Sequence, residues 1–111
     1  MVKPYMPKRG DLIWLQFSPQ QGHEQKGHRP AIVLSPLSYN KKVGLALCCP
    51  ITNQQKGYPF EVPLPDSAQT RGVILADQLK SLDWRKRQAD FIEKAPESTL
   101  NETLGKIHTL L

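Results

Sequence analysis

The sequence predicts a mainly β domain with one C-terminal helix, folded as a small, strongly bent antiparallel sheet or barrel. Short apolar runs recur along the chain between turn residues, among them 10 prolines and 7 glycines. The last part of the chain instead repeats apolar residues at helical spacing. A length of 111 residues suits one domain. We therefore expect residues 1–111 to form a single unit rather than a parallel α/β layer.

The expected strands follow the apolar runs in order: residues 12–17, 31–34, 43–51, 60–64, 73–79 and 88–93. Residues 37–42 are expected to form a turn or one helical turn, and residues 82–87 an irregular basic corner. Pro50 requires a bulge or a sheet edge, because proline has no N–H for the ladder. Glu61 is expected to point outward from its strand, between two apolar neighbours.

The helix at the C-terminus is expected from a stripe of apolar residues on one face: Leu100, Leu104, Ile107 and Leu111. Pro96 suits its first turn, and Thr99 with Glu102 has the spacing of a capping box. We interpret the stripe as part of the core or as an interface with a second copy, which makes a homodimer plausible.

Composition narrows the functional classes. The formal charge of +5 favours a polyanionic partner such as nucleic acid. No apolar run approaches the roughly 20 residues that span a bilayer, so no membrane partner is expected. The start of the chain has no apolar core of a signal peptide, which indicates a cytoplasmic protein. Cys48 and Cys49 are adjacent, and we expect them to be buried thiols in a reducing compartment.

The stretch over residues 23–30 concentrates reactive side chains: an acid, two imidazoles, a lysine and an arginine. It leads into the strand at residues 31–34, which is expected to pair with residues 43–51 across a short connection. Residues whose numbers sum to about eighty should then face each other. Arg29 and Thr52 are therefore expected to lie opposite one another.

The loops that flank this pair should leave the sheet at the same end. They place one set of polar side chains on a shared rim: Glu24, His28, Arg29, Thr52, Gln54 and Lys56. An arginine fork can hold phosphate oxygens, a threonine hydroxyl can donate to them, and a glutamate or histidine can accept a proton from a ribose 2′-hydroxyl. The rim therefore suits cleavage of RNA with the nucleophile supplied by the substrate.

Other readings of these residues remain open. Arg29 can pair with Glu24 for structural reasons only, and Thr52 can simply cap a strand. The three histidines have no carboxylate cluster at ligand spacing, so neither a metal nor another cofactor is expected. Asp77 and Gln78 interrupt an apolar run and need partners or a role. Arg85 belongs to the basic corner, where it can contact a phosphate or merely be solvated.

Several motifs occur in order over nearly the whole chain: GDLIW (10–14), GHEQ and HRPA (22–31), CPIT (49–52), KGYPF (56–60), and GV with ADQ (72–78). In these motifs the chain resembles the MazF/PemK-like (Kid-like) toxins of bacterial toxin–antitoxin modules, and most closely the MazF branch. The resemblance implies an SH3-like barrel, a homodimer, and a sequence-specific, metal-independent endoribonuclease (an mRNA interferase) that cleaves single-stranded RNA. It also implies a cognate antitoxin as partner.

The resemblance further implies roles for individual residues. Arg29 and Thr52 match the catalytic pair, and Glu24 matches a proposed base, although His28 remains an alternative. Leu75 stands where the Kid branch has an arginine, so that branch's catalytic assignment does not transfer. The residues expected to bind RNA are His28, Gln54, Lys56, Asp77, Gln78 and Arg85.

Two further classes of function remain as alternatives. Gyrase poisons have a related barrel, but they rely on a Trp-Gly-Ile end, and this chain finishes His-Thr-Leu-Leu. A basic RNA-binding module without catalysis would not need Glu24, Arg29 and Thr52 to converge. Such a module typically presents aromatic platforms, whereas only 7% of this chain is aromatic.

Overall fold

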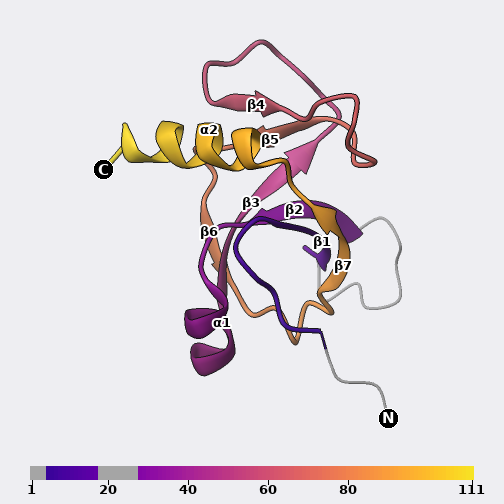
Figure 1. Ribbon diagram of the computed structural model, residues 1–111, viewed down its shortest axis with the longest axis vertical. Coiled ribbons are helices and arrows are strands. Elements are labelled where there is room, and N and C mark those ends of the chain that lie inside the picture. Colours follow the sequence, from indigo (N-terminus) through magenta and orange to yellow (C-terminus); the bar gives the residue numbers. More distant parts are fainter. Residues whose placement is uncertain (1–4, 18–27) are drawn as a thin grey trace.

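The computed structural model describes residues 5–17 and 28–111, and its strands form one bent antiparallel sheet. In chain order the elements are β1 (Asp11–Gln16), β2 (His28–Val33), α1 (Leu37–Val43), β3 (Ala46–Thr52), β4 (Glu61–Pro63), β5 (Val73–Leu75), β6 (Lys80–Leu82), β7 (Asp90–Lys94) and α2 (Glu97–His108). The helix α2 lies beside β4 and β5, and α1 lies at the opposite end of the molecule (Figure 1). The prediction of a mainly β domain with a C-terminal helix is confirmed.

The strand order is β4-β5-β3-β2-β1-β7, and β6 pairs with β3 outside this path. The central strand β3 changes partner along one edge: residues 46–48 pair with β6, and residues 51–52 pair with β5. This change bends the sheet. Within the described ranges β4 and β7 do not pair with each other, so the sheet stays open. Pro50 lies between the two paired stretches, where a missing N–H disturbs the ladder least.

The pairing of β2 with β3 confirms the predicted register, with Ala31 opposite Pro50 and Val33 opposite Cys48. The connection between them is a helix, α1, which ends at Gly44 in the left-handed conformation (φ 81°). Because glycine adopts this conformation without a steric penalty, the chain turns there. The third strand therefore begins at Ala46, whereas the apolar pattern suggested a start at residue 43.

The prediction of one strand over residues 73–79 is wrong. The strand β5 ends at Leu75, and residues 76–79 form a turn in which the N–H of Gln78 donates to the carbonyl of Leu75 (3.1 Å); β6 begins only at Lys80. The polar pair at residues 77–78 explains the break, since both side chains are exposed in this turn. The turn lets the chain leave one end of β3 and rejoin the strand at the other end.

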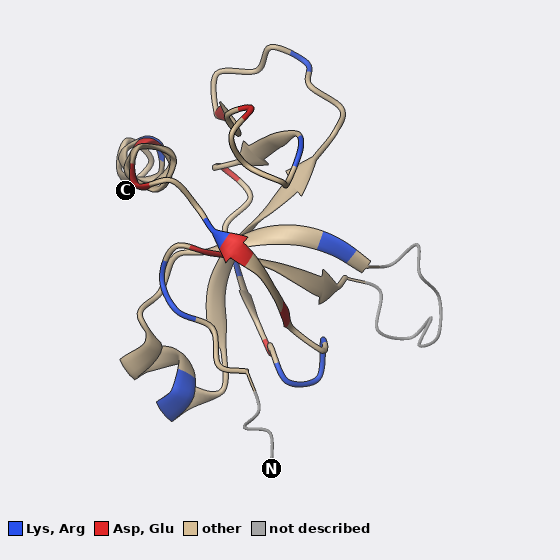
Figure 2. Cartoon of the chain, turned by 45° about the vertical axis from the view of Figure 1, so that its right-hand side comes forward, with Lys and Arg blue, Asp and Glu red and all other residues tan. Residues whose placement is uncertain are grey.

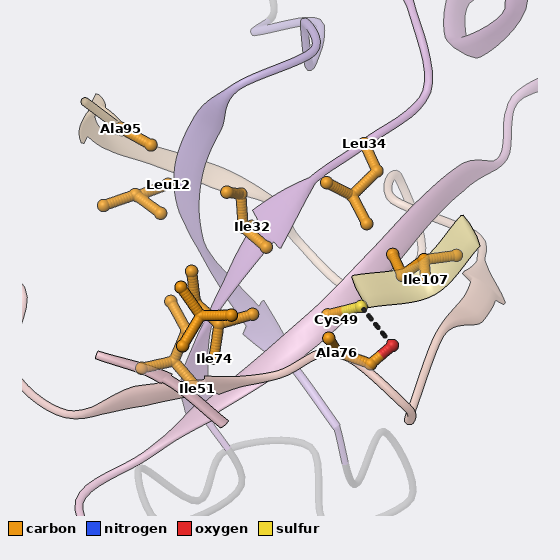
Figure 3. Packing of buried hydrophobic residues seen from close by; sticks show 10 residues of the cluster. Leu12, Ile32, Leu34, Cys49, Ile51, Ile74, Ala76, Ala95 and Ile107 are labelled. Atoms are coloured by element: carbon orange, nitrogen blue, oxygen red, sulfur yellow. Dashed lines mark hydrogen bonds between the residues drawn. The ribbon is translucent and has the colours of Figure 1, made fainter. Parts of the chain in front are cut away.

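Two apolar clusters fill the two faces of the sheet. The first includes Leu12, Ile32, Cys49 and Ile107 (Figure 3), and Leu100 and Leu104 of α2 pack against it. The second lies on the opposite face: Ile13, Leu15, Ala31, Val33, Ala46, Cys48, Leu82 and Trp84. Alternation of side chains along β1, β2 and β3 produces this division. Both cysteines are free and buried, as predicted.

The capping box predicted for α2 is wrong. The helix begins at Glu97 with Pro96 at the N-cap and has no side-chain cap. Thr99 is buried inside the first turn, where its carbonyl accepts a hydrogen bond from Thr103 Oγ1 (2.8 Å). Of the predicted stripe, only the part up to Ile107 packs on the core, and Leu111 is 89% exposed beyond the helix end. Over residues 5–17 and 28–111, neither helix has the length and apolar character needed to cross a bilayer.

Candidate active site

A groove of about 760 Å³ opens beside the first cluster and includes Ile51 of that cluster in its lining. It is lined by strands β1, β2, β3 and β7 and by two loops: Trp14, His28, Arg29, Pro30, Ile51, Thr52, Asn53, Gln54, Gln69, Thr70, Arg71 and Ile92. Trp14 and Pro30 lie two residues along their strands from the core residues Leu12 and Ile32. Arg29 and Thr52 share the alternation of the second cluster instead, so the groove gathers residues from both faces at this end of the strands.

Arg29 and Thr52 line this groove from neighbouring strands. The last pair of the β2–β3 ladder is Ala31 opposite Pro50, and the same register continued for two residues sets Arg29 opposite Thr52. The N–H of Gln54 donates to Thr52 Oγ1 (3.1 Å). This bond orients the hydroxyl and leaves its proton available for a ligand in the groove.

A second groove of about 610 Å³ shares Thr52 and Gln54 with the first, so the two form one continuous surface. Its remaining lining gathers three more of the residues expected to bind RNA: Lys56, Asp77 and Gln78. The exposed turn between β5 and β6 supplies two of them, and the loop before β4 supplies the lysine. Lys56 was expected on the same rim as Thr52 and Gln54, whereas the sequence had not placed Asp77 and Gln78 beside them.

Glu61 fixes the shape of the loop before β4. Its carboxylate accepts the N–H groups of Lys56 (2.9 Å), Gly57 (3.0 Å) and Tyr58 (3.3 Å). The expectation that Glu61 points outward is wrong, because the side chain is buried beneath this loop. A buried carboxylate requires such donors, and three consecutive N–H groups supply them.

Tyr58 and Asp77 join the two sides of the second groove. The Tyr58 hydroxyl donates to Asp77 Oδ2 (2.7 Å). This hydrogen bond and the charge of Asp77 raise the pKa of Tyr58, so the phenol stays protonated at neutral pH. Tyr58 is 48% exposed, and its ring is available to a ligand.

Trp14 and His28 form an aromatic pair that sequence reasoning missed. Their ring centroids are 5.3 Å apart with an interplanar angle of 32°, and Trp14 is 39% exposed in the groove. The signal that identifies Trp14 is its place between Ile13 and Leu15, which are both fully buried on the other face.

Arg85 lies outside both grooves among the described residues. Its guanidinium carbon stands 5.0 Å above the ring of Trp84, in the turn between β6 and β7. The neighbouring Arg87 donates to the carbonyl of Gln16 (3.0 Å), and Gln16 pairs with His28. The basic turn therefore adjoins the His28 end of the groove without forming part of its lining.

Lysines and arginines are spread over several loops and over α1 rather than gathered on one strand (Figure 2). Glu24, the expected base, lies outside the described residues. Within the described part of the chain, no group of three or more His, Cys, Asp or Glu side chains is placed to hold a metal ion.

Comparison with known proteins identifies the family. A family model described as PemK-like, MazF-like toxin of type II toxin–antitoxin system matches residues 8–111. The endoribonuclease toxin MazF of Escherichia coli (strain K12) is 53% identical over 112 residues, covering 100% of this chain and 99% of that protein. The crystal structure of MazF (Form-I) from Deinococcus radiodurans has a TM-score of 0.87 and 53% identity over 96% of each chain.

A crystal structure of MazE–MazF (Form-III) from the same organism has a TM-score of 0.87 and 49% identity, again over 96% of each chain. The sequence match therefore extends over nearly the whole chain, and the similarity of fold extends equally far. The resemblance inferred from the motifs is confirmed, and this chain belongs to the PemK-like, MazF-like toxins of type II toxin–antitoxin systems.

Proposed function

We propose that this endoribonuclease toxin cuts single-stranded RNA at specific sequences, without a metal, by attack of a ribose 2′-hydroxyl on the adjacent phosphate. The observation that supports this mechanism is the presence of Arg29 and Thr52 in one groove, on facing positions of neighbouring strands. Together they offer a charged fork and an oriented hydroxyl to a single phosphate.

In this mechanism the 2′-oxygen forms a bond to phosphorus while the bond from phosphorus to the 5′-oxygen breaks. Arg29 stabilises the charge on the nonbridging oxygens, and Thr52 donates to one of them. The proton of the 2′-hydroxyl passes to Glu24 or His28, and the departing 5′-oxygen gains a proton. The products are a 2′,3′-cyclic phosphate and a free 5′-hydroxyl.

The second groove is the proposed site of sequence recognition. Gln54, Asp77 and Gln78 present amide and carboxylate groups that can bond to base edges. Lys56 can hold a phosphate beside them. The continuity of the two grooves at Thr52 lets one RNA strand occupy both, with the cut where they meet. Arg85 then serves as an outlying phosphate contact beyond His28.

We further propose that the protein is a homodimer, acts on mRNA in the cytoplasm, and is neutralised by a cognate antitoxin. Support for the antitoxin comes from the MazE–MazF complexes among the similar structures. An acidic segment of the antitoxin would occupy the basic groove and exclude RNA. Support for the dimer is the open sheet, whose outer strands β4 and β7 each pair on one side only within residues 5–17 and 28–111.

The decisive experiment uses RNA altered at one atom. Cleavage sites in a long RNA are first mapped by primer extension, and a short oligonucleotide is then made with deoxyribose in place of the ribose before the cut. We expect the deoxy oligonucleotide to bind and to resist cleavage, and we expect a chelator to leave the rate on normal RNA unchanged. Cutting of the deoxy oligonucleotide, or a 5′-phosphate product formed only with magnesium, would overturn the mechanism. Binding without any cleavage would instead favour the non-catalytic RNA-binding module.

A further inference from the structure

The segment over residues 69–72, between β4 and β5, forms one wall of the groove and is held by a carboxylate from the other end of the sheet. Glu93 of β7 accepts the N–H of Gln69 (3.2 Å), the N–H of Thr70 (2.8 Å) and the hydroxyl of Thr70 (2.8 Å). Because β7 and β4 are the two outermost strands of the open sheet, this clamp bridges its two ends.

The other end of the segment is fixed to the strand that carries Thr52. Val73 pairs with Thr52, and Gly72 approaches the Thr52 backbone so closely that no side chain fits between them. The carbonyl of Gly72 also accepts the N–H of Leu64 (3.0 Å). The segment is thus anchored at both ends within the site.

Arg71 lies between these anchors and lines the same groove as Arg29. It forms an ion pair with Asp66 at 3.9 Å, and the two side chains are 71% and 108% exposed. An ion pair of this length and exposure holds its members weakly. The guanidinium can therefore turn to a phosphate in the groove at little cost.

The Glu93 carboxylate, which holds the segment, already accepts hydrogen bonds from it. Burial raises the pKa of Glu93, but the hydrogen bonds from Thr70 and Gln69 lower it by more, so the group is ionised at neutral pH. Its oxygens receive three donors and point to the segment instead of the RNA path. Because these three donors surround its charge, Glu93 can lie beside a groove that binds nucleic acid.

We propose that Arg71 binds an RNA phosphate next to the one that is cut, and that Glu93 is a positioning residue that holds Arg71 in place through Thr70. This inference rests on the proposed function, because it assumes RNA in the groove with the reacting phosphate at Arg29. It assigns Arg71 to substrate binding and leaves the chemical step to Arg29 and Thr52.

The first test measures binding to the deoxy oligonucleotide, which does not depend on cleavage. Arg71→Ala should raise Kd roughly tenfold, the loss of one charged hydrogen-bonding partner. It should also reduce the slope of log Kd against log salt by about 0.7, the value for one phosphate on a single strand. Lys42→Ala removes the same charge from the exposed end of α1 and should change neither quantity. An unchanged Kd and slope for Arg71→Ala would overturn the proposal.

The second test separates positioning from folding. Glu93→Gln and Thr70→Val should each raise Kd and KM with kcat little changed, whereas Thr70→Ser, which keeps the hydroxyl, should behave like the parent. Circular dichroism confirms that each variant is folded. In the Arg71→Ala background, Glu93→Gln should cause no further loss, because the positioned group is already gone. Losses that add in the double variant would contradict a role through Arg71.

These outcomes are separate from those that test the mechanism. If RNA with the deoxyribose substitution is still cut, the proposed chemistry is wrong. The effect of Arg71→Ala on binding is then judged independently of that result. If the mechanism holds and Arg71→Ala binds normally, only the inference about Arg71 and Glu93 fails.

Discussion

Gly72 lies against the backbone of Thr52, and a Cβ placed on Gly72 would come within 2.3 Å of the Thr52 carbonyl oxygen and 2.9 Å of its carbonyl carbon. Gly72 also has a φ of +115°, which side chains rarely adopt. The contact ties the groove wall to the strand that carries one of the two proposed catalytic residues. Thr52 can occupy its position only because the neighbouring residue is glycine.

Gly72→Ala should therefore impair cleavage as well as stability. The added methyl group must push the Thr52 backbone, and a displacement of about 1 Å can cost on the order of 100-fold in rate. Gly44→Ala is the matched control, since Gly44 also has a positive φ (+81°) but nothing lies within 4 Å of its Cβ position. That variant should lose only about 1–2 kcal/mol of stability and keep the parent kcat. Equal kcat values for the two folded variants would show that the contact with Thr52 is unimportant.

Arg29→Ala should abolish most cleavage and leave the fold intact. Arg29 is exposed at the start of β2 and lies outside both apolar clusters, so its loss should not move the unfolding midpoint. Removal of one preorganised charge donor typically lowers kcat by about 100-fold to 1,000-fold. Thr52→Ala should act in the same direction. Arg29→Lys tests the geometry, because lysine keeps the charge but has no bidentate fork, and it should restore little of the rate. A variant that cuts normally, or one that melts far below the parent, would show that the site is wrongly assigned.

Trp14 should stack on a base of the bound RNA. Its ring is exposed beside His28 in the groove, and stacking of one base on an aromatic side chain contributes about 1–3 kcal/mol to binding. Trp14→Ala should weaken binding of the deoxy oligonucleotide by that amount. In the parent, RNA should protect Trp14 from a soluble fluorescence quencher. Trp84 is the internal control, because it is buried and donates to the carbonyl of Asn40 (3.1 Å). Quenching of Trp14 that is the same with and without RNA would argue against the stack.

The β2–β3 pairing was predictable from the sequence because it is local. A short connection and two apolar runs fix the register, and the register alone brings Arg29 to Thr52. The loop side chains Gln54 and Lys56 followed from the same geometry. Period-two alternation also predicts that Trp14 faces away from its buried neighbours. This was overlooked because the residues around Trp14 are apolar on both faces of the strand.

The groove wall could not be predicted in this way, since its contacts join residues distant in the sequence. Nothing near Thr70 indicates that Glu93 will hold it, and nothing near Gly72 indicates that Thr52 will lie against it. The end of the strand at Leu75, before the turn that leads to β6, was missed for a related reason. It depends on β3 having two partners along one edge, a property of the whole sheet. Apolar pattern gives the position of strands along the chain but not their order in space.

The two cysteines should be unreactive in the folded protein. Burial, followed by the charge of neighbouring groups, raises the pKa of Cys48 and of Cys49 to about 12. The thiolate is the reacting form, so at pH 8 its fraction is on the order of 10⁻⁴. Iodoacetamide should therefore leave the native protein unmodified, as measured by mass spectrometry, and should label both thiols after unfolding in denaturant. Rapid labelling of the native protein would indicate that β3 opens readily.

The clamp at Glu93 should weaken in acid. The folded-state pKa of Glu93 lies below its ordinary value of 4.5, because its hydrogen bonds from Thr70 and Gln69 outweigh the effect of burial. A lowered carboxyl pKa contributes stability that is fully present above the unfolded value and is lost as the pH falls through the folded value. The N–H groups of Gln69 and Thr70 should therefore exchange slowly at pH 5 and above, and lose protection as the pH falls below about 4.5.

Nuclear magnetic resonance of these two amides checks the prediction directly. Their chemical shifts should titrate with a midpoint below 4.5 in the parent, and this step should vanish in Glu93→Gln, whose side chain does not ionise. The Gly44 amide, which donates to the carbonyl of Asn40 (2.9 Å) at the end of α1, provides the reference, since no carboxylate takes part in that bond. A midpoint at or above 4.5, or a step that persists in Glu93→Gln, would show that another group controls this wall of the groove.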